Sequence, residues 1–103
     1  MQIAEVAKRY GITVDTIRYY ERIGLVPHVP RLPNGIRDFT EYDCGWVEFI
    51  RCMRESGVQI EALVEYVALF QEGEHTAAAR LEILEEQRAK LVAKLDEMQA
   101  TAK

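Results

Sequence analysis

Two short amphipathic segments separated by a glycine open the chain, and they restrict its fold more than any other feature. Apolar side chains in residues 3–10 recur at the i, i+3, i+4 and i+7 spacing of one helix face. Gly11 then occupies the position at which helices commonly end in a left-handed residue, and Thr13 can cap a second helix that ends near Gly24. Two helices joined by a short glycine-containing turn are typical of a helix-turn-helix motif, which we place at about residues 2–23.

The second segment contains Arg-Tyr-Tyr-Glu-Arg at residues 18–22, and its adjacent tyrosines have two interpretations. Neighbouring residues on a helix lie about 100° apart, so one apolar stripe does not cover both rings. The rings can be buried with satisfied hydroxyls, or at least one hydroxyl can donate to a phosphate beside the flanking arginines. The residues alone leave both interpretations open.

The next segment is expected to form a wing. Three prolines between residues 27 and 33 exclude a regular helix there. Asn34-Gly35 is the strongest short-range signal for a two-residue hairpin turn, and apolar residues flank it. We therefore expect a small β-ribbon over residues 30–39, within a wing at about residues 27–39.

The rest of the chain has helical patterns. Residues 40–71 contain two apolar helix faces separated by Gly57, and a polar break follows them. From about Thr76 onward, the abundance of Ala, Leu, Glu and Lys predicts a single long helix. We therefore expect two domains, residues 1–72 and residues 73–103.

The long terminal helix carries a coiled-coil seam. Its apolar side chains alternate in steps of four and three, which is the a/d pattern of about four heptads with one charged member. A narrow apolar row on a helix that leaves its domain needs a partner, so the pattern predicts a homodimer through a two-helix coiled coil. The seam consists of Ala77, Leu81, Leu84, Arg88, Leu91, Leu95, Met98 and Ala102.

The charge of the chain is unevenly distributed. A net charge of −4 over 103 residues argues against nucleic-acid binding when the chain is taken as a whole. Between Lys8 and Arg37, however, six Lys and Arg residues accompany two acids, which gives a local charge of +4. Because the field at a phosphate is local over about a Debye length, this segment can bind nucleic acid. Composition therefore permits DNA binding without requiring it, and the same basic residues can also form a merely solvated face.

The two cysteines indicate the compartment. Cys44 and Cys52 lie eight positions apart on one predicted helix, about 12 Å along its axis. That span exceeds the limit of about 7 Å between Cα atoms for a disulfide, so no bridge between them is expected. Two reduced thiols, no apolar run of about 20 residues and no signal peptide favour a soluble, cytoplasmic protein.

Cys52 borders the apolar face of its helix, and its role also has two interpretations. A small, partly buried thiol usually only fills space in the core. Arg51 and Arg54 favour the reactive thiolate, whereas the nearby helix C-terminus disfavours it. Cys44 lies on the other side of the helix and is expected to be an incidental, partly exposed thiol.

The sequence offers no catalytic or metal-binding pattern. His28 and His75 are isolated, and no phosphate-binding loop, Ser/His/Asp set or metal-ligand spacing occurs. Softer metals would lack thiolate ligands in sufficient number. We therefore expect no enzyme activity, no metal and no cofactor.

The stretch IAEVAKRYGITVDTIRYYERIGLVP is followed by NGIRDF, a two-helix segment and a long terminal helix. This order resembles the MerR family of bacterial transcription regulators over the whole chain. Within that family, GIRDF, WVEFIRCMRESG and IEALVEYVALFQEG are similar to the thiol-dependent branch typified by AdhR and NmlR, which is implicated in responses to aldehydes and nitrosative stress. One departure from the family pattern is Gln59, a poor helix cap where Ser or Thr is usual.

The resemblance implies a mostly α fold, in which a winged helix-turn-helix DNA-binding domain carries a long dimerisation helix that forms an antiparallel coiled coil. Such regulators are activators that bend and untwist double-stranded promoter DNA with a long spacer between the −35 and −10 elements. RNA polymerase can then engage both elements. The second helix would enter the major groove. A small electrophile (an aldehyde, an oxidant or a nitrosating species) would activate the protein by modifying Cys52.

Candidate site residues follow from the motifs and the resemblance together. The residues expected to contact DNA are Thr13, Asp15, Thr16, Arg18, Tyr19, Tyr20, Arg22, Asn34 and Arg37. The residues expected at the dimer interface are Leu81, Leu84, Arg88, Leu91, Leu95 and Met98. The alternative is a helical dimer that does not bind DNA and instead scaffolds a partner protein through its acidic second half.

Overall fold

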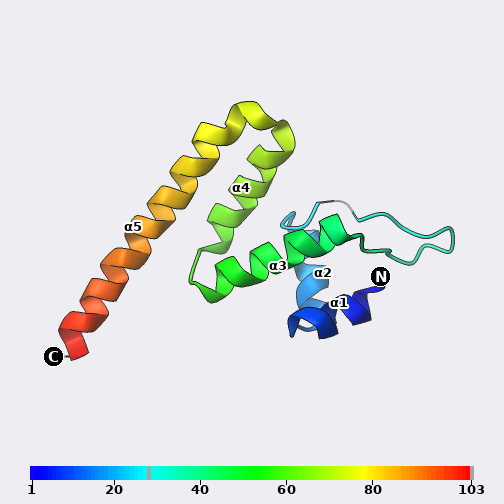
Figure 1. Ribbon diagram of the computed structural model, residues 1–103, viewed down its shortest axis with the longest axis horizontal. Coiled ribbons are helices and arrows are strands. Elements are labelled where there is room, and N and C mark those ends of the chain that lie inside the picture. The colour runs from blue at the N-terminus through cyan, green and yellow to red at the C-terminus, as the bar shows by residue number, and fades with distance from the viewer. Residues whose placement is uncertain (28, 103) are drawn as a thin grey trace. The chain divides into compact units, whose positions relative to one another are not determined.

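The computed structural model describes residues 1–27 and 29–102, so His28 and Lys103 lie outside the described residues. Its regular elements in these ranges are all helices, which confirms the mostly α prediction with a long terminal helix (Figure 1). The elements are α1 (Ile3–Tyr10), α2 (Val14–Arg22), α3 (Glu41–Glu55), α4 (Ile60–Glu72), the 3-10 helix η1 (Glu74–Thr76) and α5 (Ala77–Ala102).

The helices fall into two compact units, Met1–Glu55 and Ser56–Lys103. The first unit contains α1, α2 and α3, and the second contains α4, η1 and α5. The division drawn from the sequence ended the first domain at residue 72 and so placed α4 with the preceding helices. In the structure α4 packs along α5, which groups it with the long helix.

The helix-turn-helix of the first unit is built by its two caps. Gly11 ends α1 with φ of 67°, in the left-handed region that glycine adopts without strain. The backbone N–H of Ile12 donates to the carbonyl of Ala7 at 3.1 Å, which closes this helix end. The hydroxyl of Thr13 then accepts from the backbone N–H of Thr16 at 3.0 Å and starts α2. These contacts confirm the predicted helix-turn-helix.

The third helix begins with reciprocal capping. The hydroxyl of Thr40 accepts from the backbone N–H of Asp43 at 3.2 Å, and the Asp43 carboxylate accepts from the backbone N–H of Thr40 at 2.9 Å. Asp43 is buried, and these bonds satisfy a charge that would otherwise be costly there. The core of the first unit comprises Val6, Ala7, Ile17, Tyr20, Leu25, Val26, Val29, Phe39, Cys44, Trp46, Val47 and Ile50.

The wing differs from the predicted β-ribbon over residues 30–39. In the described part of the wing, pairing is limited to one antiparallel bridge between Arg31 and Arg37. The turn is a three-residue loop, because the N–H of Leu32 donates to the carbonyl of Ile36 at 2.7 Å. Only Gly35 in this loop has positive φ, at 86°, whereas a two-residue type I′ turn requires it at both central positions.

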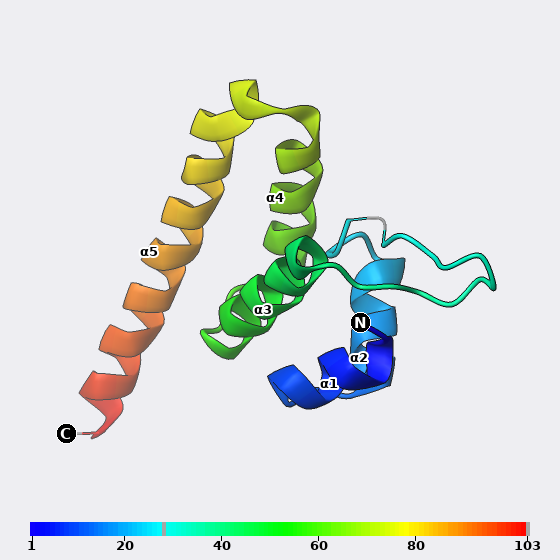
Figure 2. The same cartoon turned by 45° about the vertical axis from the view of Figure 1, so that its right-hand side comes forward.

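The second unit is an antiparallel helical hairpin. Chain direction reverses through η1, where the Thr76 hydroxyl lies 2.7 Å from the carbonyls of Leu69 and Gly73. Figures 1 and 2 show α5 beside α4 and continuing past the beginning of α4. None of the helices in the described ranges has the length and apolarity needed to cross a membrane.

The missing cap of α4 is supplied from α5. Gln59 makes no side-chain cap, as its residue type suggested, but its backbone N–H donates to the side-chain oxygen of Gln87 at 3.1 Å. The Gln87 amide donates in return to the Gln59 side chain at 3.3 Å. Gln87 is only 5% exposed. The two hydrogen bonds therefore give partners both to its buried side-chain amide and to a backbone N–H at the start of α4.

Candidate nucleic-acid interface

One face of α2 carries a cluster of exposed polar and aromatic side chains. Asp15, Arg18, Tyr19 and Arg22 follow the i, i+3, i+4 and i+7 spacing, so they lie on one side of the helix. All four are exposed, and Nη1 of Arg18 lies 3.7 Å from the carboxylate of Asp15, three residues earlier in the same helix. An exposed pair of this kind contributes little stability and leaves both groups able to rearrange.

The two tyrosines divide between the surface and the core. The Tyr20 ring is 8% exposed and packs inward, whereas Tyr19 is 36% exposed. The ring centroids lie 6.3 Å apart, and the Arg22 guanidinium lies 5.5 Å from the centre of the Tyr19 ring. Burial raises the pKa of the Tyr20 hydroxyl. Adjacent helical positions point in different directions, and the Tyr20 ring takes the buried one. Contact of the Tyr20 hydroxyl with DNA stays an expectation.

The start of α2 presents two hydroxyls. The oxygens of Thr13 and Thr16 lie 2.8 Å apart, so one hydroxyl donates to the other. One of the two hydroxyl hydrogens therefore remains for a further acceptor. This pair lies at the N-terminus of a helix, where backbone N–H groups and the helix dipole favour an anion.

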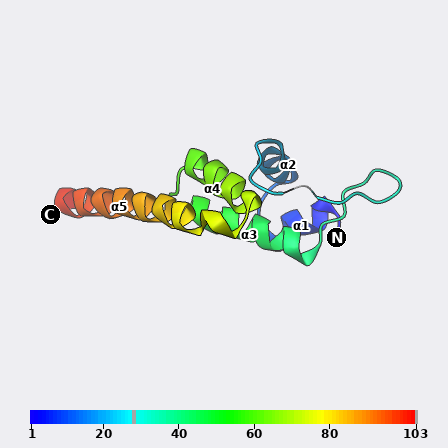
Figure 3. The same ribbon diagram turned by 90° about the horizontal axis from the view of Figure 1, so that it is seen from above.

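The wing adds its own polar groups. The side-chain oxygen of Asn34 accepts from the backbone N–H of Ile36 at 3.1 Å, which leaves its amide nitrogen at the exposed tip. Arg31, which the motifs did not single out, donates through Nη1 to the carbonyl of Gly35 at 2.8 Å. Figure 3 shows the wing as a loop that extends away from the helices of its own unit.

Arg37 is held by a carboxylate from α2. Its Nε lies 2.7 Å from Oε1 of Glu21 and also contacts Oε2 of the same carboxylate. Glu21 was not among the expected site residues. The signal for it in the sequence was an acid inside the otherwise basic segment from Lys8 to Arg37, but no local spacing connects it to a residue sixteen positions away.

The cysteines of α3 occupy different environments, and neither forms a disulfide in the part of the chain that the structure describes. Cys44 is 1% exposed, which corrects the expectation of a partly exposed thiol, and burial is the main reason that its pKa is raised. Cys52 is half-buried, and Nη2 of Arg51 lies 3.7 Å from its sulfur. Nη1 of Arg51 donates to Glu55 at 3.1 Å, so a cation is fixed beside this thiol.

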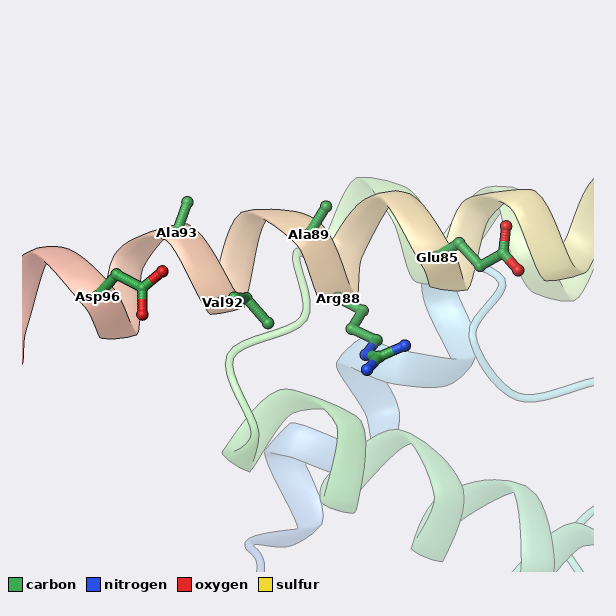
Figure 4. A pocket seen from close by; sticks show the side chains of 6 residues that line it. All are labelled: Glu85, Arg88, Ala89, Val92, Ala93 and Asp96. Carbon is green, nitrogen blue, oxygen red and sulfur yellow. The ribbon is translucent and has the colours of Figure 1, made fainter.

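The long helix exposes much of its predicted seam. The seam side chains of Leu81, Leu95 and Met98 are more than half exposed, whereas Leu84 and Leu91 are half-buried against their own unit. Arg88 is exposed on the same side and borders a shallow hollow on α5 (Figure 4). The hollow is lined by Glu85, Arg88, Ala89, Val92, Ala93 and Asp96.

No metal centre is formed by the described residues, among which no three His, Cys, Asp or Glu side chains gather closely enough to hold an ion. His75 is exposed in η1.

Two family models match the chain. Residues 1–69 match the MerR HTH family regulatory protein model, which covers both helices of the helix-turn-helix and the wing. Residues 45–103 match the model described as MerR, DNA binding.

Individual relatives agree with these matches. The chain is 54% identical over 92 residues to the HTH-type transcriptional regulator AdhR of Bacillus subtilis, which covers 89% of this chain and 66% of AdhR, slightly less than two thirds. A protein from Listeria monocytogenes assigned to the MerR family of transcriptional regulators superposes with a TM-score of 0.93 at 48% identity, over 99% of this chain and 77% of that one. HiNmlR, a MerR family regulator that lacks the sensor domain, is solved bound to promoter DNA. It superposes with a TM-score of 0.85 at 27% identity, over 98% of this chain and 80% of that one.

Proposed function

The chain belongs to the MerR family of helix-turn-helix regulatory proteins, and from this we propose that it binds double-stranded promoter DNA as a homodimer and regulates transcription. The observation that carries the proposal is the exposed face of α2, where Arg18, Tyr19 and Arg22 project together from a capped helix-turn-helix. The likeness to HiNmlR supports the same ligand, because that protein is solved on promoter DNA.

In this proposal α2 enters the major groove and the wing contacts the flanking backbone. Basic side chains and hydroxyls would mostly bind phosphates and so position the protein, whereas base contacts from Asp15, Thr16 or Arg18 would add sequence readout. The proposed contact residues are Thr13, Asp15, Thr16, Arg18, Tyr19, Arg22, Asn34 and Arg37, with Tyr20 contributing at most its hydroxyl because its ring lies in the core.

We further propose that the protein acts by bending and untwisting a promoter whose −35 and −10 elements are too far apart, which lets RNA polymerase engage both. Deforming DNA costs several kcal/mol, about 1–6 for a bend of 40–90°, so many backbone contacts are required. Two copies of the helix-turn-helix, joined through an antiparallel coiled coil of α5, would provide them. The exposed Leu81, Leu95 and Met98 support such an interface.

Cys52 is the residue proposed to receive the signal. It is half-buried and has a fixed arginine beside its sulfur, whereas Cys44 is enclosed by the core. With an aldehyde, an S–C bond would form as the carbonyl π bond breaks, and the carbonyl oxygen would take the proton of the thiol. The adduct would then enlarge the side chain on α3 and alter how this helix packs.

Fluorescence anisotropy tests the proposal with promoter duplexes of increasing spacer length, before and after formaldehyde or a nitrosating agent, on the wild-type protein and Cys52→Ser. We expect binding that weakens steeply with salt, because phosphate contacts release counterions. DNA distortion or transcription should respond to the agent in the wild type alone. An equal response in both proteins would remove Cys52 as the sensor, and no binding at any spacer length would favour the protein scaffold instead.

A further inference from the structure

The Glu21–Arg37 pair joins two elements that the proposed function places on DNA. Glu21 belongs to α2, and Arg37 lies on the returning arm of the wing. Nε of Arg37 donates to both carboxylate oxygens, with 2.7 Å to Oε1. The side chains are 29% and 18% exposed for Arg37 and Glu21, so solvent screens this pair less than the exposed Asp15–Arg18 pair.

The geometry leaves the outer edge of the guanidinium unused. An arginine has five N–H donors, and Glu21 engages the single one on Nε. Within the described ranges the Nη1 and Nη2 groups of Arg37 have no other partner. Arg9, Arg18 and Arg51 differ, because each pairs with its carboxylate through Nη1.

A carboxylate that accepts a hydrogen bond from Nε fixes the orientation of the guanidinium group. A free arginine loses considerable rotamer freedom when it binds a phosphate, and a guanidinium that is already held loses less. The four N–H donors on the Nη groups match the bidentate geometry of phosphate oxygens. The bridge of Arg37 to Arg31 further restricts the backbone of this residue.

We propose that Glu21 is a positioning residue, which holds Arg37 through Nε so that its Nη groups bind a DNA phosphate. This inference rests on the proposed function, because it takes promoter DNA as the ligand. In this proposal Glu21 increases DNA affinity. Its charge alone would predict the opposite, since an unpaired carboxylate near DNA repels phosphates.

Glu21→Gln changes DNA affinity in opposite directions if Glu21 positions Arg37 and if it acts only through its charge. If Glu21 acts only through its charge, then Glu21→Gln removes a negative charge and tightens binding. If Glu21 positions Arg37, the same substitution weakens binding although the protein becomes less acidic. Glu48→Gln is the matched control, because it makes the same charge change at an exposed position of α3 in the same unit.

The experiment uses the full chain and a duplex that the wild type itself selects from a random library. Fluorescence anisotropy over a range of salt concentrations measures the wild type, Glu21→Gln, Arg37→Gln, the double variant, Arg37→Lys and Glu48→Gln. Circular dichroism confirms that each variant is folded. Arg37→Lys keeps a charge that can pair with Glu21, so it retains the fold if the pair is needed for folding.

We expect Glu21→Gln to bind about threefold to tenfold more weakly and Glu48→Gln to bind as tightly as the wild type or slightly more tightly. Arg37→Gln should bind more weakly and lower the salt slope by about 0.9, the value for one lost phosphate contact. Adding Glu21→Gln to Arg37→Gln should weaken binding no further, and binding should tighten slightly, because Arg37→Gln leaves the Glu21 carboxylate unpaired near the DNA phosphates. Arg37→Lys should weaken binding as well, since one ammonium cannot replace the second edge of a guanidinium.

Three results would overturn the inference. The first is binding by Glu21→Gln that is as tight as the wild type or tighter. The second is an equal loss of affinity when Glu21→Gln is introduced into the wild type and into Arg37→Gln. The third is wild-type affinity in Arg37→Lys. Failure of the proposed function looks different, because the wild type would then select no duplex from the library.

Discussion

Cδ2 of Leu91 on α5 lies 2.9 Å from the point at which a Cβ atom on Gly57 would stand. Gly57 also has φ of 97°, in the region that side chains disfavour. The turn that precedes α4 and the middle of α5 therefore meet at a residue that has no side chain, within one unit of the chain. The positive φ is the main reason that glycine is favoured at position 57, and a Cβ there would also force the terminal methyl of Leu91 to shift.

Gly57→Ala is expected to lower the free energy of unfolding by roughly 1–3 kcal/mol, because it combines backbone strain with overpacking against Leu91. Thermal unfolding followed by circular dichroism measures the change. Gly45→Ala is the matched control: Gly45 lies inside α3, has nothing within 4 Å of its added Cβ and does not have positive φ. It should stabilise by roughly 0.5–1 kcal/mol, and equal behaviour of the two variants would contradict the packing described here.

The helices could be predicted from the sequence because their signals are local. The spacing of apolar residues and the capping residues Gly11 and Thr13 depend only on near neighbours, and both residues act as expected. The wing was less predictable. Pro33 and Asn34 do not have positive φ, so the loop closes over three residues instead of two.

The site was only partly predictable, because burial depends on what packs from outside the helix. A helical wheel places Cys44 away from the main apolar face, but its surroundings in the folded unit leave it 1% exposed. The wheel likewise shows that both tyrosines cannot share a stripe, without showing that Tyr20 is the buried one. Glu21 was missed because its partner Arg37 is brought to it only by the fold.

The two thiols should differ in reactivity. With iodoacetamide at neutral pH we expect Cys52 to be alkylated first and Cys44 to react about tenfold more slowly or less, because burial shields Cys44 and raises its pKa. Peptide mapping by mass spectrometry over time measures both rates. Cys52→Ser should lose the fast phase, and a fast phase that persists in this variant would contradict the burial of Cys44.

Burial of Tyr20 should make the protein sensitive to alkali. Burial raises the pKa of this hydroxyl above its ordinary value of 10.0. Below that pH the hydroxyl is protonated in the folded and unfolded states and has no effect on the pH dependence. As the pH rises further, the unfolded chain releases the proton while the folded chain retains it, so the free energy of unfolding falls.

Tyr20→Phe is expected to flatten this alkaline decline, because the substitution removes the titrating group and keeps the ring. Urea unfolding at a series of pH values above 10.0 measures the slope for each protein. Tyr19→Phe is the control, since its ring is at the surface and its removal should leave the slope unchanged. The same decline in Tyr20→Phe as in the wild type would assign the alkaline sensitivity to other groups.

The seam on α5 should be the dimer interface. Leu95 is 54% exposed in the single chain, and burying such a side chain contributes roughly 1.5–3 kcal/mol when complete. Leu95→Glu places two charges in the interface of a homodimer, one from each copy, and should raise the dissociation constant about a hundredfold or more. Sedimentation velocity over a range of protein concentrations measures this shift.

Ala93→Glu is the matched control for this substitution, because it adds the same charge to an exposed position on α5. Ala93 lies two residues from Leu95 and therefore on nearly the opposite side of the helix. It should dimerise like the wild type, and both variants should retain their helical content because neither position is buried in the single chain. Equal dissociation of the two variants would mean that a different face of α5 mediates dimerisation, and a monomeric wild type would mean that Leu81, Leu95 and Met98 serve another partner.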